Sequence, residues 1–304
     1  MGKAGQGGGK TGRLRHRKEA RRERMVAGVN AAPVAGERAL LHAPRGGPRT
    51  LVAGDLHIGI ETQYAVGGVK LPSATFSMVR RLTALAAATR ARKLVLAGDL
   101  KHSVQAVTAQ EEDEVPSALD TLAGAFDEVV VVPGNHDGNI GSLLPRDRPN
   151  VRLAPVGGHL LRGGLLVIHG HAWPDRALAR KARAVALAHN HTAVALDTGL
   201  GAVLKEACWA RGRVNPERWR EETGGDNYPE VILMPPFNEL CTGVALNLEG
   251  GRPIGPLLRE GCVDLGRAEV YLLDGAMLGT VASLRLSLGD DSVRRLTQGV
   301  SEDL

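Results

Sequence analysis

Residues 93–102 read KLVLAGDLKH, an apolar run that ends at a glycine and passes directly into a cluster of polar residues. The same order of apolar run, glycine and polar cluster occurs before it at residues 49–57 and after it at residues 128–137. Apolar runs of about five residues between turn-forming residues are typical of buried β-strands. The sequence therefore predicts three strands, each with polar side chains at its carboxyl end.

The segments between these strands show helical periodicity. Residues 72–90 place apolar side chains at every third or fourth position. Residues 111–126 do the same, with acidic residues at the start, where the helix dipole favours them. Because proline is disfavoured inside a helix, Pro116 leads us to expect that this second helix begins near Val115. Strands that alternate with helices predict an α/β layered domain.

The second half of the chain has a different pattern. From Val151 onward, short apolar runs are separated by glycines and turns, and helical stretches are few. This pattern predicts a half built mostly of strands. Since no linker of disordered composition separates the two halves, we expect the second to pack on the first within one domain.

Composition indicates a globular protein. The 304 residues are 43% hydrophobic, which is sufficient for a buried core. The chain has neither the apolar segment of a signal peptide nor the roughly 20 consecutive apolar residues of a membrane span, so we expect a cytoplasmic protein without a membrane partner. Cys208, Cys241 and Cys262 form no CxxC pair, which argues against a disulfide framework or a zinc knuckle. We expect them to be buried free thiols.

The formal net charge of +5 is concentrated at one end of the chain. Residues 1–24 hold nine Lys or Arg and two Glu, a net charge of +7, which leaves the other 280 residues at −2. A basic, Gly-rich segment buries too little apolar surface to fold on its own. We therefore expect a disordered tail at residues 1–25, a folded domain at residues 26–290 and a short tail at residues 291–304. The basic tail is either a solvated segment or a loose contact for a phosphate backbone.

Polar residues at the predicted strand ends form five clusters. A single Asp or His in such a position is more often a helix cap or a core histidine bonded to a backbone carbonyl. Five clusters in one chain, each after an apolar run, instead point to a shared site. Carboxylate, amide and imidazole groups bind divalent cations, and a carboxylate with two oxygens can bridge two of them. The residues concerned are Asp55, His57, Asp99, His102, Asn135, His136, His169, His171, His189 and His191.

The order of these motifs is DxH, GDxxH, GNHD, a histidine and HxH, and it resembles that of the calcineurin-like metallophosphoesterase superfamily from about Leu51 to His191. Within the superfamily, the chain resembles the ICC-like archaeal and bacterial phosphoesterases related to SbcD-type DNA nucleases. The matching segments are residues 55–59 (DLHIG), 234–238 (MPPFN) and 273–275 (LDG). The resemblance implies a layered αββα sandwich of two mixed β-sheets flanked by helices.

The resemblance also implies a role for each residue, with Asp99 bridging two metal ions. The implied ligands of the two ions are, respectively, Asp55, His57, Asp99 and His191, and Asp99, Asn135, His169 and His189. His136 and His102 would be the catalytic histidines, and His102 favours cleavage of phosphodiesters. Two positions depart from the family pattern. Ala188 stands where a Gly usually precedes the last HxH motif, and His171 has no clear counterpart.

The function that the resemblance implies is hydrolysis of a phosphoester by a hydroxide that bridges the two metal ions. Mn²⁺ is the expected metal, and Fe or Zn²⁺ would suit the same ligands. The expected substrate is DNA or RNA in a nuclease-like reaction. A small nucleotide-type mono- or diester is the alternative, because the body of the chain is acidic whereas nucleases usually present a basic groove. A third alternative is a non-catalytic scaffold that binds nucleic acid or a helicase partner.

Overall fold

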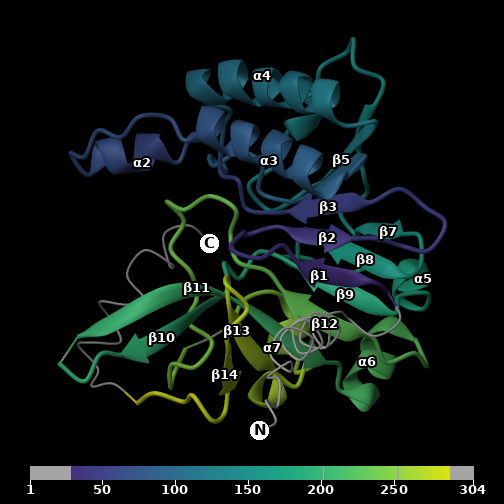
Figure 1. Cartoon of the computed structure of the whole chain (residues 1–304), viewed down its shortest axis with the longest axis vertical. Helices are drawn as coiled ribbons and strands as arrows, with labels where there is room; N and C mark the ends of the chain where they lie inside the picture. Colours follow the sequence, from purple (N-terminus) through teal and green to yellow (C-terminus); the bar gives the residue numbers. More distant parts are fainter. Residues whose placement is uncertain (1–28, 201, 252, 288–304) are drawn as a thin grey trace, which may run out of the picture.

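Two mixed β-sheets pack face to face at the centre of the molecule, and helices lie on their outer faces (Figure 1). The computed structural model describes residues 29–200, 202–251 and 253–287. The tails predicted at residues 1–25 and 291–304 lie outside the described residues. This architecture confirms the predicted αββα sandwich.

The first sheet is formed by the amino-terminal half of the chain. Its strand order is β1-β2-β3-β4-β5-β6. The first three strands are antiparallel, whereas β3 to β6 are parallel to one another. The strands span Ala31–Pro33 (β1), Leu40–His42 (β2), Thr50–Ala53 (β3), Lys93–Ala97 (β4), Glu128–Val132 (β5) and Val151–Leu153 (β6).

The second sheet is formed by the carboxyl-terminal half, in the order β14-β13-β11-β12-β9-β8-β7, with β10 paired to β11. Strands β8, β9 and β12 are parallel, and the other pairings are antiparallel. The strands span His159–Leu161 (β7), Leu165–Ile168 (β8), Ala184–Leu187 (β9), Ala193–Asp197 (β10), Val203–Arg213 (β11), Glu230–Leu233 (β12), Glu269–Leu272 (β13) and Met277–Thr280 (β14).

Helices cover both outer faces. Figure 1 shows α3 (Thr75–Thr89) and α4 (Ala109–Ala125) together on the first sheet, and the short α2 (Glu61–Val66) extends beside them. Three further helices pack on the second sheet, namely α5 (Arg176–Ala179), α6 (Pro216–Thr223) and α7 (Pro256–Arg259). Short 3₁₀ helices occur at Ile140–Leu143 and Leu265–Arg267. Among the helices that the structure describes, none has the length and apolar character required to cross a membrane.

The apolar core has three layers, and successive side chains of a central strand point into different layers. In β4, Leu94 and Leu96 pack against α3 and α4, whereas Val95 and Ala97 face the second sheet. Burial of one leucine side chain contributes about 1.5–3 kcal/mol. A one-residue slip of β4 would exchange these two faces, so the apolar pattern fixes the register and with it the position of the polar residues that follow.

Helix α4 begins at Ala109, so the predicted start near Val115 was wrong. The side chain of Thr108 accepts a hydrogen bond from the backbone N–H of Glu111, and the Glu111 carboxylate accepts one from the backbone N–H of Thr108. This capping box satisfies the helix terminus ahead of the proline. Pro116 removes one hydrogen bond inside the helix, but the burial of Val115 and neighbouring apolar residues keeps the helix continuous.

Candidate metal centre

The five predicted clusters lie on loops that follow five strands, three in the first sheet and two in the second. Strands β3, β4 and β5 are adjacent and parallel, so their carboxyl ends meet at one edge of the sheet. The pairing continues past β3, because the backbone N–H of Asp55 donates to Gly98 O at 3.0 Å and that of His57 donates to Asp99 O at 2.9 Å. Strands β8 and β9, which precede the late histidines, are also parallel neighbours. The fold thus brings distant parts of the sequence to one place.

The first group of converging atoms belongs to Asp55, His57, Asp99 and His191, whose ligand atoms lie within 4.8 Å of one another. His57 Nε2 is 3.1 Å from His191 Nε2 and 3.6 Å from Asp99 Oδ2. His191 Nε2 is 3.7 Å from Asp55 Oδ1. Ring nitrogens and carboxylate oxygens that face one another at such distances could surround a single cation.

The second group belongs to Asp99, His169 and His189. His169 Nε2 lies 3.2 Å from Asp99 Oδ2 and 3.1 Å from Asn135 Oδ1. The ring centroids of His169 and His189 are 4.7 Å apart. All seven residues predicted as ligands are therefore brought together, and Asp99 belongs to both groups.

Hydrogen bonds from the far side of two rings fix which nitrogen faces the centre. His169 Nδ1 donates to Ala97 O at 3.0 Å, and His191 Nδ1 donates to Thr242 O at 3.1 Å. In the neutral form of each ring, Nε2 then keeps its lone pair toward the carboxylates. Metal-binding histidines are commonly held in this way by a backbone carbonyl.

The backbone at the centre is strained. Asp55, His57, Asp99, His189 and His191 all have positive φ angles, between 42° and 66°. This left-handed conformation is uncommon for residues with a Cβ atom and is found mostly at tight turns and functional sites. In this conformation the chain turns sharply at each strand end, so that neighbouring side chains point into the same space.

Two glycines allow the loops to approach one another. A methyl group at Gly98 would lie 2.3 Å from His169 Nδ1, and one at Gly134 would lie 2.0 Å from Asp99 Oδ1. Both distances are far shorter than a van der Waals contact. Gly54 has a related role, because a methyl group there would lie 2.9 Å from Cβ of Ala188. The alanine that departs from the family pattern thus packs against a glycine.

The ionisable groups of the centre are buried and lie close to one another. Burial raises the pKa of Asp55, and its Oδ2 atom has no hydrogen-bond partner among the described residues. Burial alone would lower the pKa of His169, but the carboxylates of Asp99 and Asp55 raise it to about 9. Burial and the neighbouring His169 lower the pKa of His189 to about 2. Buried oxygen and nitrogen donors with an unpartnered carboxylate oxygen fit hard or borderline divalent cations.

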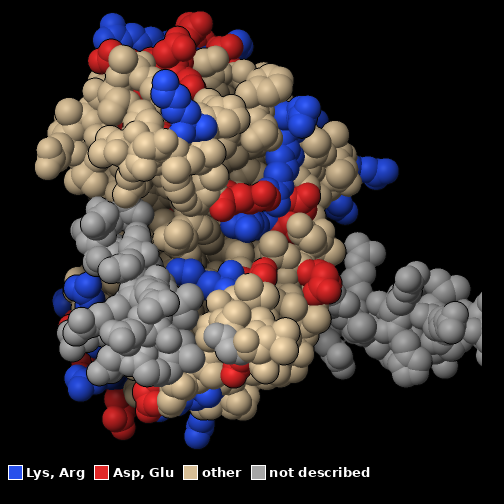
Figure 2. Space-filling model, turned by 90° about the vertical axis from the view of Figure 1, so that its left-hand side faces the viewer, with Lys and Arg blue, Asp and Glu red and all other residues tan. Residues whose placement is uncertain are grey.

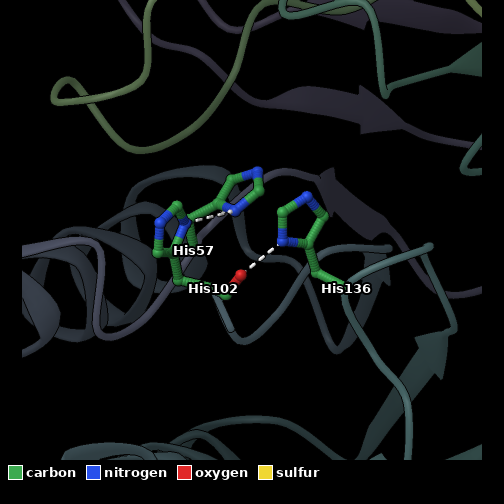
Figure 3. A group of neighbouring side chains, drawn as sticks. All are labelled: His57, His102 and His136. Carbon is green, nitrogen blue, oxygen red and sulfur yellow. Dashed lines mark hydrogen bonds between the residues drawn. The ribbon is translucent and has the colours of Figure 1, made fainter. Parts of the chain in front are cut away.

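The two histidines predicted as catalytic, His102 and His136, lie beside His57 of the first group (Figure 3). His136 Nδ1 donates to the backbone carbonyl of His102, so Nε2 of His136 is the nitrogen that faces the centre, 3.9 Å from Asp99 Oδ2. His102 Nδ1 lies 3.2 Å from His57 Nδ1, and His102 Nε2 lies 2.9 Å from Gln63 Oε1. Both histidines are in contact with the predicted ligands, but the ring of His102 is turned toward His57.

Several supporting residues hold these loops. Asp137 accepts hydrogen bonds from the backbone N–H groups of Gly134 and Leu100, at 2.8 and 2.9 Å, and so ties the loop after β5 to the loop after β4. Asn238, in the MPPFN segment, donates to Leu56 O at 2.8 Å. Asn190 donates to Ile254 O at 3.1 Å. The sequence motifs identified these segments, but the hydrogen bonds between them could not be predicted from the motifs.

Two residues near the centre, Gln63 and Cys241, were not predicted from the sequence. Gln63 occurs in no motif, and only the position of α2 places it beside His102. Cys208 and Cys262 are buried as predicted, but the expectation was wrong for Cys241, which is half-buried. The Sγ atom of Cys241 lies within 4.8 Å of ligand atoms of His57 and His191. Its position shortly after the MPPFN segment was the available signal.

Comparison with known proteins places the chain in a family. Among solved structures, nuclease MPE of Pseudomonas putida is 19% identical, with a TM-score of 0.42, and the match covers 81% of this chain and 98% of that chain. YfcE, a phosphoesterase from E. coli, is 17% identical, with a TM-score of 0.35 and coverage of 77% of this chain and 98% of that chain. Residues 48–232, more than half of the sequence, match the family model for calcineurin-like phosphoesterases. The chain therefore belongs to the calcineurin-like phosphoesterase family and is a hydrolase that acts on phosphoric ester bonds.

Proposed function

We propose that this protein hydrolyses phosphodiester bonds at a centre of two divalent metal ions, in a nuclease-like reaction. The observation that carries the proposal is the shared carboxylate of Asp99, which belongs to both groups of converging atoms. Two bound ions supply a nucleophile at neutral pH and stabilise negative charge on the phosphate. The residues that would hold them are Asp55, His57, Asp99 and His191 for one ion, and Asp99, Asn135, His169 and His189 for the other.

The protein's own contribution to the reaction comes from its histidines. Because the carbonyl of His102 holds His136 Nδ1, His136 is oriented to present Nε2 to a phosphate oxygen and to stabilise the charge that develops there. His102 has the position of a second catalytic histidine in the family pattern, where it would help the leaving oxygen of a diester to depart. Its ring centroid lies 5.7 Å from that of His136. This pair is the reason to propose diesters before monoesters.

The donor set also suggests the metal. Apart from the nearby Cys241, the converging groups are carboxylates, an amide and imidazoles. Such a set suits Mn²⁺, Fe or Zn²⁺. Mn²⁺ is the proposed ion, with Fe and Zn²⁺ as alternatives to be compared in the same assay.

Surface charge favours a second candidate, a small nucleotide-type phosphoester. Strand β3, which leads into Asp55 and His57, points toward the left in Figure 1, and Figure 2 views the molecule from that side. On the described part of this face, Lys and Arg side chains are interspersed with Asp and Glu side chains. A long polyanion usually binds along a basic groove, whereas a short substrate needs only the centre itself.

A substrate panel tests the proposal. The full chain, stripped with a chelator and reloaded with Mn²⁺, Fe²⁺ or Zn²⁺, is assayed on single- and double-stranded DNA, RNA, a dinucleotide, and chromogenic diester and monoester substrates. Asp99→Asn removes the shared carboxylate, and Asp113→Asn removes the same charge from an exposed position on α4. We expect the unaltered protein to hydrolyse diesters. In Asp99→Asn the rate should fall by more than about 100-fold, since loss of the shared carboxylate removes charge stabilisation at the reacting phosphate. Asp113→Asn should retain full activity.

The outcomes separate the candidates. Hydrolysis of polynucleotides supports the nuclease-like reaction, and hydrolysis of only the dinucleotide or the monoester supports the second candidate. A protein that binds two ions but hydrolyses no member of the panel would contradict both and would favour a scaffold for nucleic acid or a helicase.

A further inference from the structure

The ring of His102 lies between a predicted metal ligand and a glutamine. Its Nδ1 atom is 3.2 Å from Nδ1 of His57, and its Nε2 atom is 2.9 Å from Oε1 of Gln63 (Figure 3 shows the His57 contact). Two Nδ1 atoms at hydrogen-bond distance share one proton, so one ring donates and the other accepts. The three side chains therefore form a chain of hydrogen bonds that has a direction.

The amide oxygen of Gln63 sets this direction. An amide oxygen only accepts, so His102 Nε2 carries the proton and His102 Nδ1 is an acceptor. His57 Nδ1 must then donate to His102, which leaves the lone pair of His57 on Nε2. That atom faces Asp99 Oδ2 at 3.6 Å. In the opposite direction, Nε2 of His57 would carry a proton and could not bind a cation.

The chain of hydrogen bonds is fixed at its middle by the backbone. The backbone N–H of His102 donates to Ile58 O at 3.0 Å and to Glu111 Oε1 at 2.9 Å. Glu111 is fully buried and also receives the backbone N–H of Ser103 at 2.6 Å. The position of His102 therefore depends on the capped start of α4 and on the loop after β3, and not on a bound substrate.

We infer that His102 and Gln63 are positioning residues that hold His57 in the tautomer able to bind metal. The inference rests on the proposed function only in taking His57 as a ligand. It gives His102 a second task besides the one at the leaving group, and this task needs no substrate, because both ring nitrogens take part in the chain of hydrogen bonds. Gln63 becomes a determinant of metal affinity although it is separated from the ion by two rings.

Metal titration of the chelator-stripped full chain tests the inference without any substrate. Zn²⁺ alone is the probe, and calorimetry gives the affinity and the number of ions. His102→Leu removes the acceptor for His57, so one of the two ions should bind about 10- to 100-fold more weakly. His102→Asn places an amide oxygen near the former position of Nδ1 and should restore the affinity to within a few-fold of the unaltered protein.

Gln63 provides a matched pair at the other end of the chain. Gln63→Met keeps the length of the side chain but removes the acceptor, and it should weaken the same ion by several-fold. In Gln63→Glu the carboxylate can still accept the hydrogen bond from His102, so this variant should retain the affinity for the metal ion. If His102→Leu proves unstable in thermal unfolding, this pair still decides the matter, because α2 is short and lies outside the sheets.

Two results would overturn the inference. One is a His102→Leu protein, or a Gln63→Met protein if His102→Leu is unstable, that binds both ions with the affinity of the unaltered chain. The other is loss of affinity in Gln63→Glu equal to that in Gln63→Met. Failure of the proposed function would look different, since a chain that hydrolyses no phosphoester can still show the expected order of metal affinities.

Discussion

The two sheets contribute different chemistry to the same centre. The loops of the first sheet supply two carboxylates, an amide and one imidazole, whereas the loops of the second sheet supply imidazoles only. Carboxylate and amide groups on short side chains must be brought close by the backbone, and the continued pairing beyond β3 and β4 does this. Imidazoles reach farther and need only to be turned correctly by a hydrogen bond on their far side. The first sheet thus sets the charge and shape of the centre, and the imidazoles of the second sheet would complete the coordination of a bound ion.

The largest expected effect comes from a comparison of one residue from each sheet. Asp99→Ala should abolish binding of both ions, because its carboxylate belongs to both groups, whereas His189→Ala should remove one ion only. The loss of metal affinity in Asp99→Ala should exceed about 100-fold. Mutation of a residue that only hydrogen-bonds to a metal ligand typically costs about 10- to 100-fold. Metal content after dialysis, measured by mass spectrometry, gives the number of ions directly. Loss of both ions in His189→Ala would contradict this expectation and would show that binding of both ions depends equally on the second sheet.

A smaller effect is expected where the loops of the first sheet approach each other. Gly134→Ala would place a methyl group 2.0 Å from Asp99 Oδ1, and we expect it to destabilise the fold by about 1–3 kcal/mol. Gly124→Ala is the matched control, because no atom lies within 4 Å of the added methyl group in α4. It should stabilise the protein by about 0.5–1 kcal/mol. Urea unfolding measures both changes, and equal stability of the two variants would contradict the close approach of the loops.

The smallest effect concerns a hydrogen bond between the sheets. His42, in β2, has its Nε2 atom 2.8 Å from Arg162 O, in the turn between β7 and β8. Burial lowers the pKa of His42 below its usual value near 6.5. The unfolded chain therefore takes up a proton before the folded protein does, and stability falls as the pH drops below about 6.5. The slope due to this one group is at most about 1.4 kcal/mol per pH unit.

His42→Gln keeps a side chain that can donate to Arg162 O but does not titrate. Urea unfolding of both proteins from about pH 7.5 to about pH 5.5 should show a flatter pH dependence for the variant. The difference between the two curves isolates His42 from the histidines of the metal centre. Parallel curves would mean that this contact between the sheets is not sensitive to pH.

Local patterns were sufficient to predict much of the fold. Strands β3, β4 and β5 lie where apolar runs end at glycines, because a buried strand and its turn are both encoded within a few residues. The eleven residues of β11 (Val203–Arg213) escaped prediction, since charged residues interrupt its apolar pattern. Its pairing with β10, β12 and β13 depends on the whole second sheet, which no local window contains.

The candidate site was predicted in composition but not in detail. The order of motifs identified seven residues that the fold brings together, and their roles as ligands stay predictions that the metal titrations test. Contacts between loops could not be predicted, because Gln63 meets His102 only through the position of α2. Cys241 likewise reaches the centre through the segment that pairs with the loop after β3.

The left-handed backbone of the centre has a consequence for protein engineering. In the described part of the chain, eight residues other than glycine have a positive φ, and five of them are predicted ligands. A design procedure that selects the residues best suited to a positive φ would replace these five with glycine or asparagine. The fold would become more stable, but the predicted metal ligands would be lost. Libraries built to make this protein more heat-resistant should hold those positions constant. Conversely, the positions of positive φ angles in residues other than glycine would locate the centre without any information on side chains.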